Sequence, residues 1–233
     1  MLNTAPRLDL YAQIHKALRA QMMDTLHVAG RVDVRNPADL HDTCERVLAL
    51  ADVCTGHIAH ENDFVHPALE AHRPGTSAEI ASEHARHLDA IAIVRDTVAA
   101  LRTASPGARD AAALTLYRTL ALFIAENFVH MHAEETEHNR VLWAFYSDEE
   151  LLALHGRIAA AIPPHEHLDT MRWMIPAMTP AERAQVLCGL RAEAPAPMFN
   201  AVLDAVLPHL RTDDKAKLMR ALAPQEELAE AMA

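Results

Sequence analysis

Glycine is scarce in this chain of 233 residues, which contains only six. They are isolated from one another at positions 30, 56, 75, 107, 156 and 189. A dinucleotide-binding fingerprint or a phosphate-binding loop needs several glycines within a few residues. The sequence therefore argues against a nucleotide-handling α/β enzyme.

Aromatic residues and cysteines are also few. Aromatic residues make up 4% of the chain, whereas Ala, Leu, Glu and Arg are abundant, and this balance favours helix over strand. The three cysteines are odd in number and form no Cys-x-x-Cys pair. We interpret Cys44, Cys54 and Cys188 as reduced thiols of a cytoplasmic protein, with Cys44 and Cys54 packed in the core.

Positive charge and long apolar runs are lacking as well. Lys and Arg number 21 against 32 Asp and Glu, so no basic stripe for nucleic acid is evident. No stretch reaches the roughly 18 uninterrupted apolar residues of a membrane span. The N-terminal segment lacks the basic start and apolar run of a signal peptide. We expect a cytoplasmic protein with no nucleic-acid or membrane partner.

Prolines and glycines divide the first part of the chain into four long helices. They are expected at about residues 8–29, 37–70, 77–103 and 108–146, with a kink or a last turn at Pro67. Long helices joined by short links are typical of an antiparallel up-down bundle. The sequence thus predicts an all-α fold with a four-helix bundle over residues 1–146.

Residues 147–233 differ from the bundle because they contain eight of the 13 prolines of the chain. Short helices are expected at 148–161, 166–175, 181–192, 198–207 and 213–222. This C-terminal extension has three open roles: capping the bundle, reporting its state, or joining two chains in a homodimer.

Histidine is the residue in excess, with 16 in the chain and nine of them between positions 57 and 138. Bundle cores advance by three and four residues alternately, which gives one inward stripe on each helix. The stripe on the second helix is Val47, Leu50, Cys54, His57, Glu61, Phe64 and Ala68. That on the fourth is Leu116, Leu120, Phe123, Asn127, His130, Glu134, Glu137, Val141 and Ala144.

Each of these two stripes contains a histidine followed by a glutamate one turn later. The first helix contributes His15 to its own stripe, and the third contributes His84 and His87. Burying such groups without partners would cost several kcal/mol. Metal ions satisfy them directly, and imidazole with carboxylate favours iron, manganese or zinc. A hydrogen-bonded polar layer is the alternative.

The remaining polar residues of the bundle are weaker candidates for a metal site. At about 100° per residue, His66 and His132 project outward and His138 lies at the edge of the stripe, so we expect these three to be solvated. Asn127 and Glu137 flank the pair on the fourth helix. They are candidates to orient ligands or line a pocket, and ordinary capping or interhelix hydrogen bonding is equally consistent with their positions.

Four segments together resemble the hemerythrin-like HHE cation-binding domain over about residues 8–146. They are IHKALR with His15, HIAHENDFVHPAL with His57 and Glu61, SEHARHL with His84, and HMHAEETEHNRVL with His130 and Glu134. The resemblance implies two non-heme iron ions, with manganese as the alternative metal. It further implies bridging by Glu61, Glu134 and an oxo or hydroxo group, with the four histidines as terminal ligands.

The chain departs from oxygen-carrying hemerythrins, which have a fifth histidine four residues after the ligand on the third helix. Leu88 occupies that position here. His87 is a candidate for the fifth ligand or for a partner of the ligands. His60, on the flank of the second stripe, ranks below it.

Two classes of function follow from a diiron centre of this kind. The first is a protein that binds or senses O2, NO, peroxide or iron availability. The second is a redox enzyme that disproportionates hydrogen peroxide or oxygenates an organic substrate. A helical scaffold that binds adventitious metal is the third reading.

Overall fold

The computed structural model describes residues 7–223, and within them all regular structure is helical. The expectation of an all-α chain is confirmed for these residues. The chain divides into two compact units, Met1–Ala161 and Ile162–Ala233, and each is described below by itself.

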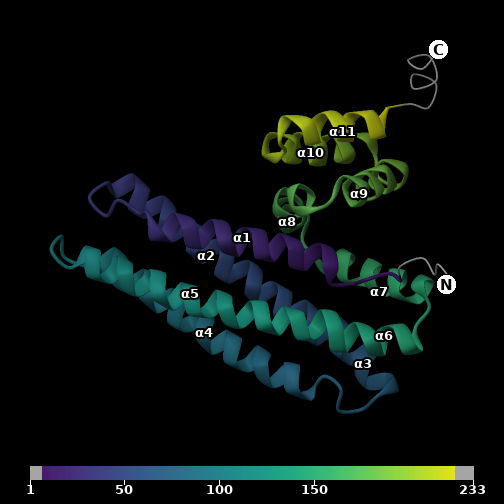
Figure 1. Ribbon diagram of the computed structural model, residues 1–233, viewed down its shortest axis with the longest axis horizontal. Helices are drawn as coiled ribbons and strands as arrows, with labels where there is room; N and C mark the ends of the chain where they lie inside the picture. Colours follow the sequence, from purple (N-terminus) through teal and green to yellow (C-terminus); the bar gives the residue numbers. More distant parts are fainter. Residues whose placement is uncertain (1–6, 224–233) are drawn as a thin grey trace. The chain divides into compact units, whose positions relative to one another are not determined.

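The first unit is built from four long helical segments, drawn from purple to green in Figure 1. The helix α1 packs against α2 and α5, and α4 packs against the same two helices. Two of the segments are continuous helices that contain a π-helical turn. The segments are α1 (Ala12–Gly30); α2 (Pro37–His60) with η1 (Glu61–Val65) and α3 (His66–His72); α4 (Ala78–Thr103); and α5 (Arg109–Ala133) with η2 (Glu134–His138) and α6 (Asn139–Phe145).

Local capping fixes where these segments begin. The Asn36 side chain accepts hydrogen bonds from the backbone N–H groups of Ala38 and Asp39, and Pro37 lies in the first turn of α2. Between α3 and α4, Gly75 has a φ of 88°, which glycine adopts without steric cost. The Glu70 carboxylate closes this turn by accepting hydrogen bonds from the N–H groups of Gly75 and Ser77.

The apolar core of the first unit lies among α1, α2, α4 and α5. Leu50, Leu101 and Leu120 are almost fully buried in it. The free thiols of Cys44 and Cys54 are buried there too, as expected for packing residues. Burial raises the pKa of the Cys54 thiol to about 12, so this group stays protonated and unreactive.

Each of the two π-helical turns begins at a glutamate of the predicted site. His66 N–H donates to the carbonyl of Glu61, and Asn139 N–H to that of Glu134, five residues earlier in both cases. A π-helical turn inserts one extra residue and rotates all that follows. The buried stripe accordingly moves forward by one position after each glutamate.

This shift corrects the expected stripes at their C-terminal ends. On the second segment Val65 and Leu69 are buried, in place of the predicted Phe64 and Ala68. On the fourth, His138 is buried and the predicted Glu137 is exposed. The helix also continues past Pro67, because that residue lies in the first turn after η1, where a missing N–H costs little.

The helix α7 (Asp148–Ala161) belongs to the first unit, which therefore extends beyond the expected boundary at residue 146. Leu151 of α7 is fully buried in an apolar cluster with Tyr11, Leu69 and Leu142. Arg7 secures the same end, since its guanidinium donates to the carbonyl oxygens of Trp143 and Tyr146.

The second unit has a core of its own, formed by Met171, Ile175, Leu187, Phe199 and Val206 among others. Its expected short helices are present as α8 (Pro164–Ala177), α9 (Pro180–Glu193), α10 (Ala196–Val206), the 3-10 turn η3 (Leu207–His209) and α11 (Thr212–Leu222). The buried Arg183 guanidinium joins the first two helices by donating to the carbonyl oxygens of Ile175 and Met178.

One helical segment of the described chain, Arg109–Phe145, is long and apolar enough to cross a membrane by length and composition. In the first unit, the same segment buries Asn127, His130 and Glu134 among the neighbouring helices.

A pair of leucines on α5 tests the core. Leu120 is fully buried and Leu122 is 62% exposed. Leu120→Ala should lower the free energy of unfolding by about 2–5 kcal/mol, because it leaves a cavity. Leu122→Ala should change it by less than about 0.5 kcal/mol. Urea unfolding followed by circular dichroism measures both, and equal effects would contradict this packing.

Candidate metal centre

The six residues predicted as principal ligands meet in one layer of the first unit. They come from all four segments, and the two glutamates open the two π-helical turns. Their donor atoms form two groups, each with members within 4.8 Å of one another. The first group is His15, His57, Glu61 and Glu134; the second is Glu61, His84, His130 and Glu134.

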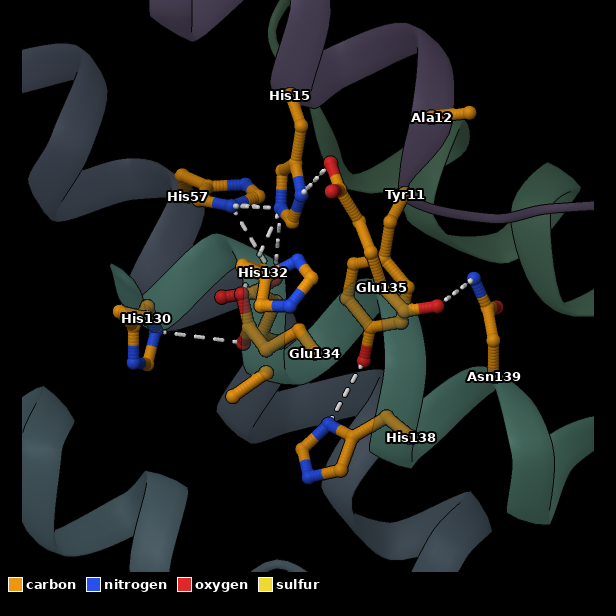
Figure 2. Close-up of polar contacts among 12 residues, drawn as sticks. Tyr11, Ala12, His15, His57, His130, His132, Glu134, Glu135, His138 and Asn139 are labelled. Atoms are coloured by element: carbon orange, nitrogen blue, oxygen red, sulfur yellow. Dashed lines mark hydrogen bonds and ion pairs between the residues drawn. The ribbon is translucent and has the colours of Figure 1, made fainter. Parts of the chain in front are cut away.

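In the first group, the imidazoles of His15 and His57 lie next to one another (Figure 2). The Nε2 atoms of His15 and His57 are 3.3 Å apart. Oε1 of Glu61 lies 3.1 Å from Nε2 of His57, and Oε2 of Glu134 lies 3.5 Å from Nε2 of His15. Two nitrogens and two carboxylate oxygens thus converge on one point.

The second group repeats this arrangement on the other edge. The Nε2 atoms of His84 and His130 are 3.0 Å apart. Oε2 of Glu61 lies 3.3 Å from Nε2 of His84, and Oε1 of Glu134 lies 3.3 Å from Nε2 of His130. Each glutamate therefore directs one oxygen to each pair of histidines.

These separations fit metal ligation. Two nitrogens bound about 2.1 Å from one ion at octahedral or tetrahedral angles are about 3.0–3.4 Å apart. Both imidazole pairs fall in that range. All four oxygens of Glu61 and Glu134 are buried, and none accepts a hydrogen bond of acceptable geometry from the described residues. A cation between the oxygens and the imidazoles would satisfy them.

Three of these imidazoles form a hydrogen bond through Nδ1 with a side-chain oxygen outside the layer. Such outer partners orient a ligating histidine and direct Nε2 toward the metal. The pairs are His15 with Glu135 at 3.1 Å, His84 with Asn62 at 2.8 Å, and His130 with Glu83 at 2.8 Å. Sequence reasoning missed all three partners, because they lie beside the predicted stripes rather than on them.

Without a metal ion, protons balance the two carboxylates. Burial by itself lowers the pKa of His15, but the hydrogen bond to Glu135 and the adjacent carboxylate of Glu61 outweigh it and raise that pKa to about 9. The pKa of His84 is likewise raised to about 9 against burial, by the adjacent carboxylates of Glu134 and Glu61. His15 and His84 are therefore cationic at neutral pH, and the pKa of His130 is raised too.

The pKa values of the two glutamates are lowered. Burial raises the pKa of Glu61, yet the adjacent imidazoles of His57, His15 and His84 bring it well below its ordinary value. Burial and the Glu61 charge raise the pKa of Glu134, and the adjacent imidazoles of His130 and His84 reverse this. Both carboxylates are therefore ionised, which is the form that binds cations.

The two further ligand candidates lie outside both donor groups. His87 is buried, with its ring 4.6 Å from that of His130, and it faces neither glutamate closely enough to join a group. His60 is half-buried at the end of α2 and also belongs to neither group. Neither position supplies the fifth ligand in this arrangement.

The two flanking residues do not orient the ligands. Asn127 is buried and donates to the carbonyl of Phe123 on its own helix. Glu137 is exposed and pairs with Arg140. The π-helical turn that follows Glu134 rotates Glu137 away from the layer.

The prediction that His66 and His138 are solvated is wrong. Both are buried, and together with Glu134 they form a third group of donor atoms within 4.8 Å. A uniform 100° per residue places His66 outward and His138 at the edge of the stripe, and the π-helical turns bring both inward. His132, which precedes the turn on its helix, is exposed as predicted.

A hollow of about 430 Å³ opens beside the centre between α4 and α5. Its lining includes His87 and Glu83, and Glu83 is the residue that holds His130. The hollow therefore reaches the residues just outside the second donor group.

The fold and the site together define an all-helical protein with a buried His/Glu cluster suited to metal cations. A family model for the hemerythrin HHE cation-binding domain matches residues 7–142, and the chain belongs to this family. No curated protein and no solved structure matched the chain.

Metal loading should release protons. At pH 7 the imidazoles of His15 and His84 must lose theirs to become ligands, because their pKa values are raised to about 9. We expect apparent affinity to increase steadily from pH 6 to pH 9. Calorimetric titration with Zn²⁺ in two buffers of different ionisation enthalpy gives the proton count. A count of zero at pH 7 would contradict the protonated cluster.

Glu83 should contribute to affinity without touching the metal. Glu83→Ala removes the oxygen 2.8 Å from Nδ1 of His130 and should weaken metal binding about 10–100-fold. Glu79→Ala, one turn earlier on α4 at an exposed position, is the control and should bind normally. Competition with a chromophoric chelator measures both variants.

Proposed function

We propose that the first unit is an antiparallel up-down four-helix bundle that binds a pair of non-heme iron ions. The observation that carries this proposal is the division of each carboxylate between two imidazole pairs. Glu61 and Glu134 would bridge the ions, with His15 and His57 on one and His84 and His130 on the other. Manganese fits the same donors.

We further propose that this centre binds or senses O2, NO, peroxide or iron itself. Ferrous ions would supply electrons and an open coordination position for such small ligands. The protein's part is to hold the imidazoles rigid through Glu135, Asn62 and Glu83, and to keep bulk water from a layer that is almost fully buried.

The second unit supports a sensing role over simple storage, since storage needs no additional helical unit with its own core. It would report the state of the centre or join two chains in a homodimer. Buried, unpaired Cys44 and Cys54 agree with a cytoplasmic location, which stays part of the proposal.

A redox enzyme is the second candidate, and the hollow beside His87 favours it. That hollow would admit a molecule larger than a diatomic gas to the edge of the second donor group. Peroxide disproportionation is the simplest reaction of this class, and oxygenation of an organic substrate is the other.

Anaerobic loading with Fe²⁺ followed by exposure to O2 tests the diiron proposal. We expect about two irons per chain after dialysis and a Mössbauer spectrum of a coupled pair. Glu61→Ala should lose that coupling, because it removes one bridge. Glu137→Ala, an exposed glutamate of η2, is the control and should keep it. Less than about one iron per chain would overturn the proposal.

Peroxide then separates the two functions on the same samples. Sustained O2 evolution that is lost in Glu61→Ala identifies an enzyme. Bleaching by one equivalent of peroxide without turnover identifies a binding or sensing protein.

A further inference from the structure

His66, Glu134 and His138 form a third group of donor atoms, whose two histidines the diiron proposal leaves unused. Their residues are 6%, 0% and 0% exposed. Both histidines are in the core because of the π-helical turns. His66 directly follows η1, which begins at Glu61, and His138 is the last residue of η2, which begins at Glu134. Both turns thus bring imidazoles toward the same carboxylate.

Each of the two histidines has a ring nitrogen without a partner among the described residues. Nε2 of His66 and Nε2 of His138 are both buried and have no hydrogen bond to the described residues. Buried polar atoms are normally satisfied, and leaving two imidazole nitrogens unpaired is costly. A ligand that binds both nitrogens would remove that cost.

The opposite side of the His138 ring is held in place. Its Nδ1 lies 3.0 Å from the hydroxyl of the fully buried Tyr11, as Figure 2 shows. When this hydroxyl accepts the Nδ1 proton, Nε2 carries a free lone pair. Tyr11 therefore orients His138 through Nδ1. Glu135, Asn62 and Glu83 contact the Nδ1 atoms of the proposed diiron ligands in the same way.

The third group shares Glu134 with the second, but its histidines are oriented differently. His66 and His84 are stacked, with ring centroids 5.0 Å apart and planes 7° apart. Imidazoles on one ion must converge to about 2.1 Å from it, whereas stacked rings run side by side. The rings of His66 and His138 are instead at 89° to one another. These two imidazoles are suited to a common ion that excludes His84.

We propose that His66, His138 and Glu134 form a third cation site beside the diiron centre, with Tyr11 as the residue that positions His138. Two imidazoles and one carboxylate suit a divalent transition-metal ion such as Zn²⁺, Fe²⁺ or Mn²⁺. The inference rests on the proposed function, because Glu134 serves both sites.

Zinc stoichiometry of the full-length, untagged protein tests this proposal. We expect three Zn²⁺ per chain after loading and dialysis, measured by elemental analysis. The double variant His66→Ala/His138→Ala should hold two, and His132→Ala, an exposed histidine of α5, should hold three. Circular dichroism establishes that the variants are folded, and anomalous scattering from zinc-loaded crystals should place a peak between His66 and His138.

The other outcomes are distinct. Two zinc ions in both wild type and double variant overturn the third site, and so does a fall from two to one, which would make the pair ligands of the main centre. The Fe²⁺-loaded double variant should keep its coupled Mössbauer spectrum, so failure of the third site leaves the diiron proposal intact. One zinc or none in wild type overturns both.

A gentler variant tests the positioning role of Tyr11. Tyr11→Phe keeps every ligand and removes only the hydroxyl on Nδ1 of His138. It should weaken the third zinc ion about tenfold or more and leave the other two unchanged. Unchanged affinity for the third ion would overturn the role of Tyr11.

Discussion

The first unit depends on two carboxylates buried against each other without hydrogen bonds. Glu61 and Glu134 are almost inaccessible, and all four of their oxygens lack a hydrogen bond of good geometry from the described residues. Such a pair is tolerable only if positive charge lies between it and the surrounding imidazoles. Protons on the histidines provide this charge without metal, and cations provide it when bound. The Nδ1 partners of His15, His84 and His130, and the Nε2 atoms that face the carboxylates, are arranged around that requirement.

The π-helical turns are located at these same two carboxylates. Each turn begins at one of the two glutamates and adds one residue to the helix. The glutamate therefore stays in the core, and different side chains face the core after it. A regular α-helix would place Phe64 and Glu137 in the core at these points. The observed register instead buries Val65 and His66 on one segment and His138 on the other.

The stripes that hold the principal ligands could be predicted because they precede the irregular turns. Up to Glu61 and Glu134 the helices are regular, and a spacing of three and four residues places His57 and His130 inward. Beyond the glutamates the same spacing is wrong by one residue at Phe64, Ala68 and Glu137, although Val141 is buried as predicted. No local propensity in the sequence marks a π-helical turn. The partners Glu83 and Glu135 were missed for another reason. They are half-buried at stripe edges, where a charged residue is usually solvated.

Metal ions and protons would compete for the same imidazole nitrogens. The stability of the fold should therefore depend on whether the metal site is occupied. The raised pKa values of His15 and His84 stabilise the metal-free fold fully below about pH 6.5, and that contribution is lost as pH rises through about 9. A bound cation replaces the protons over the same interval, and it stabilises the folded state by mass action. Because the proposed ligands come from four helical segments, an ion at this layer would join all of them. The second unit supplies none of the three donor groups and keeps a separate core, so metal loading should act directly on the stability of the first unit alone.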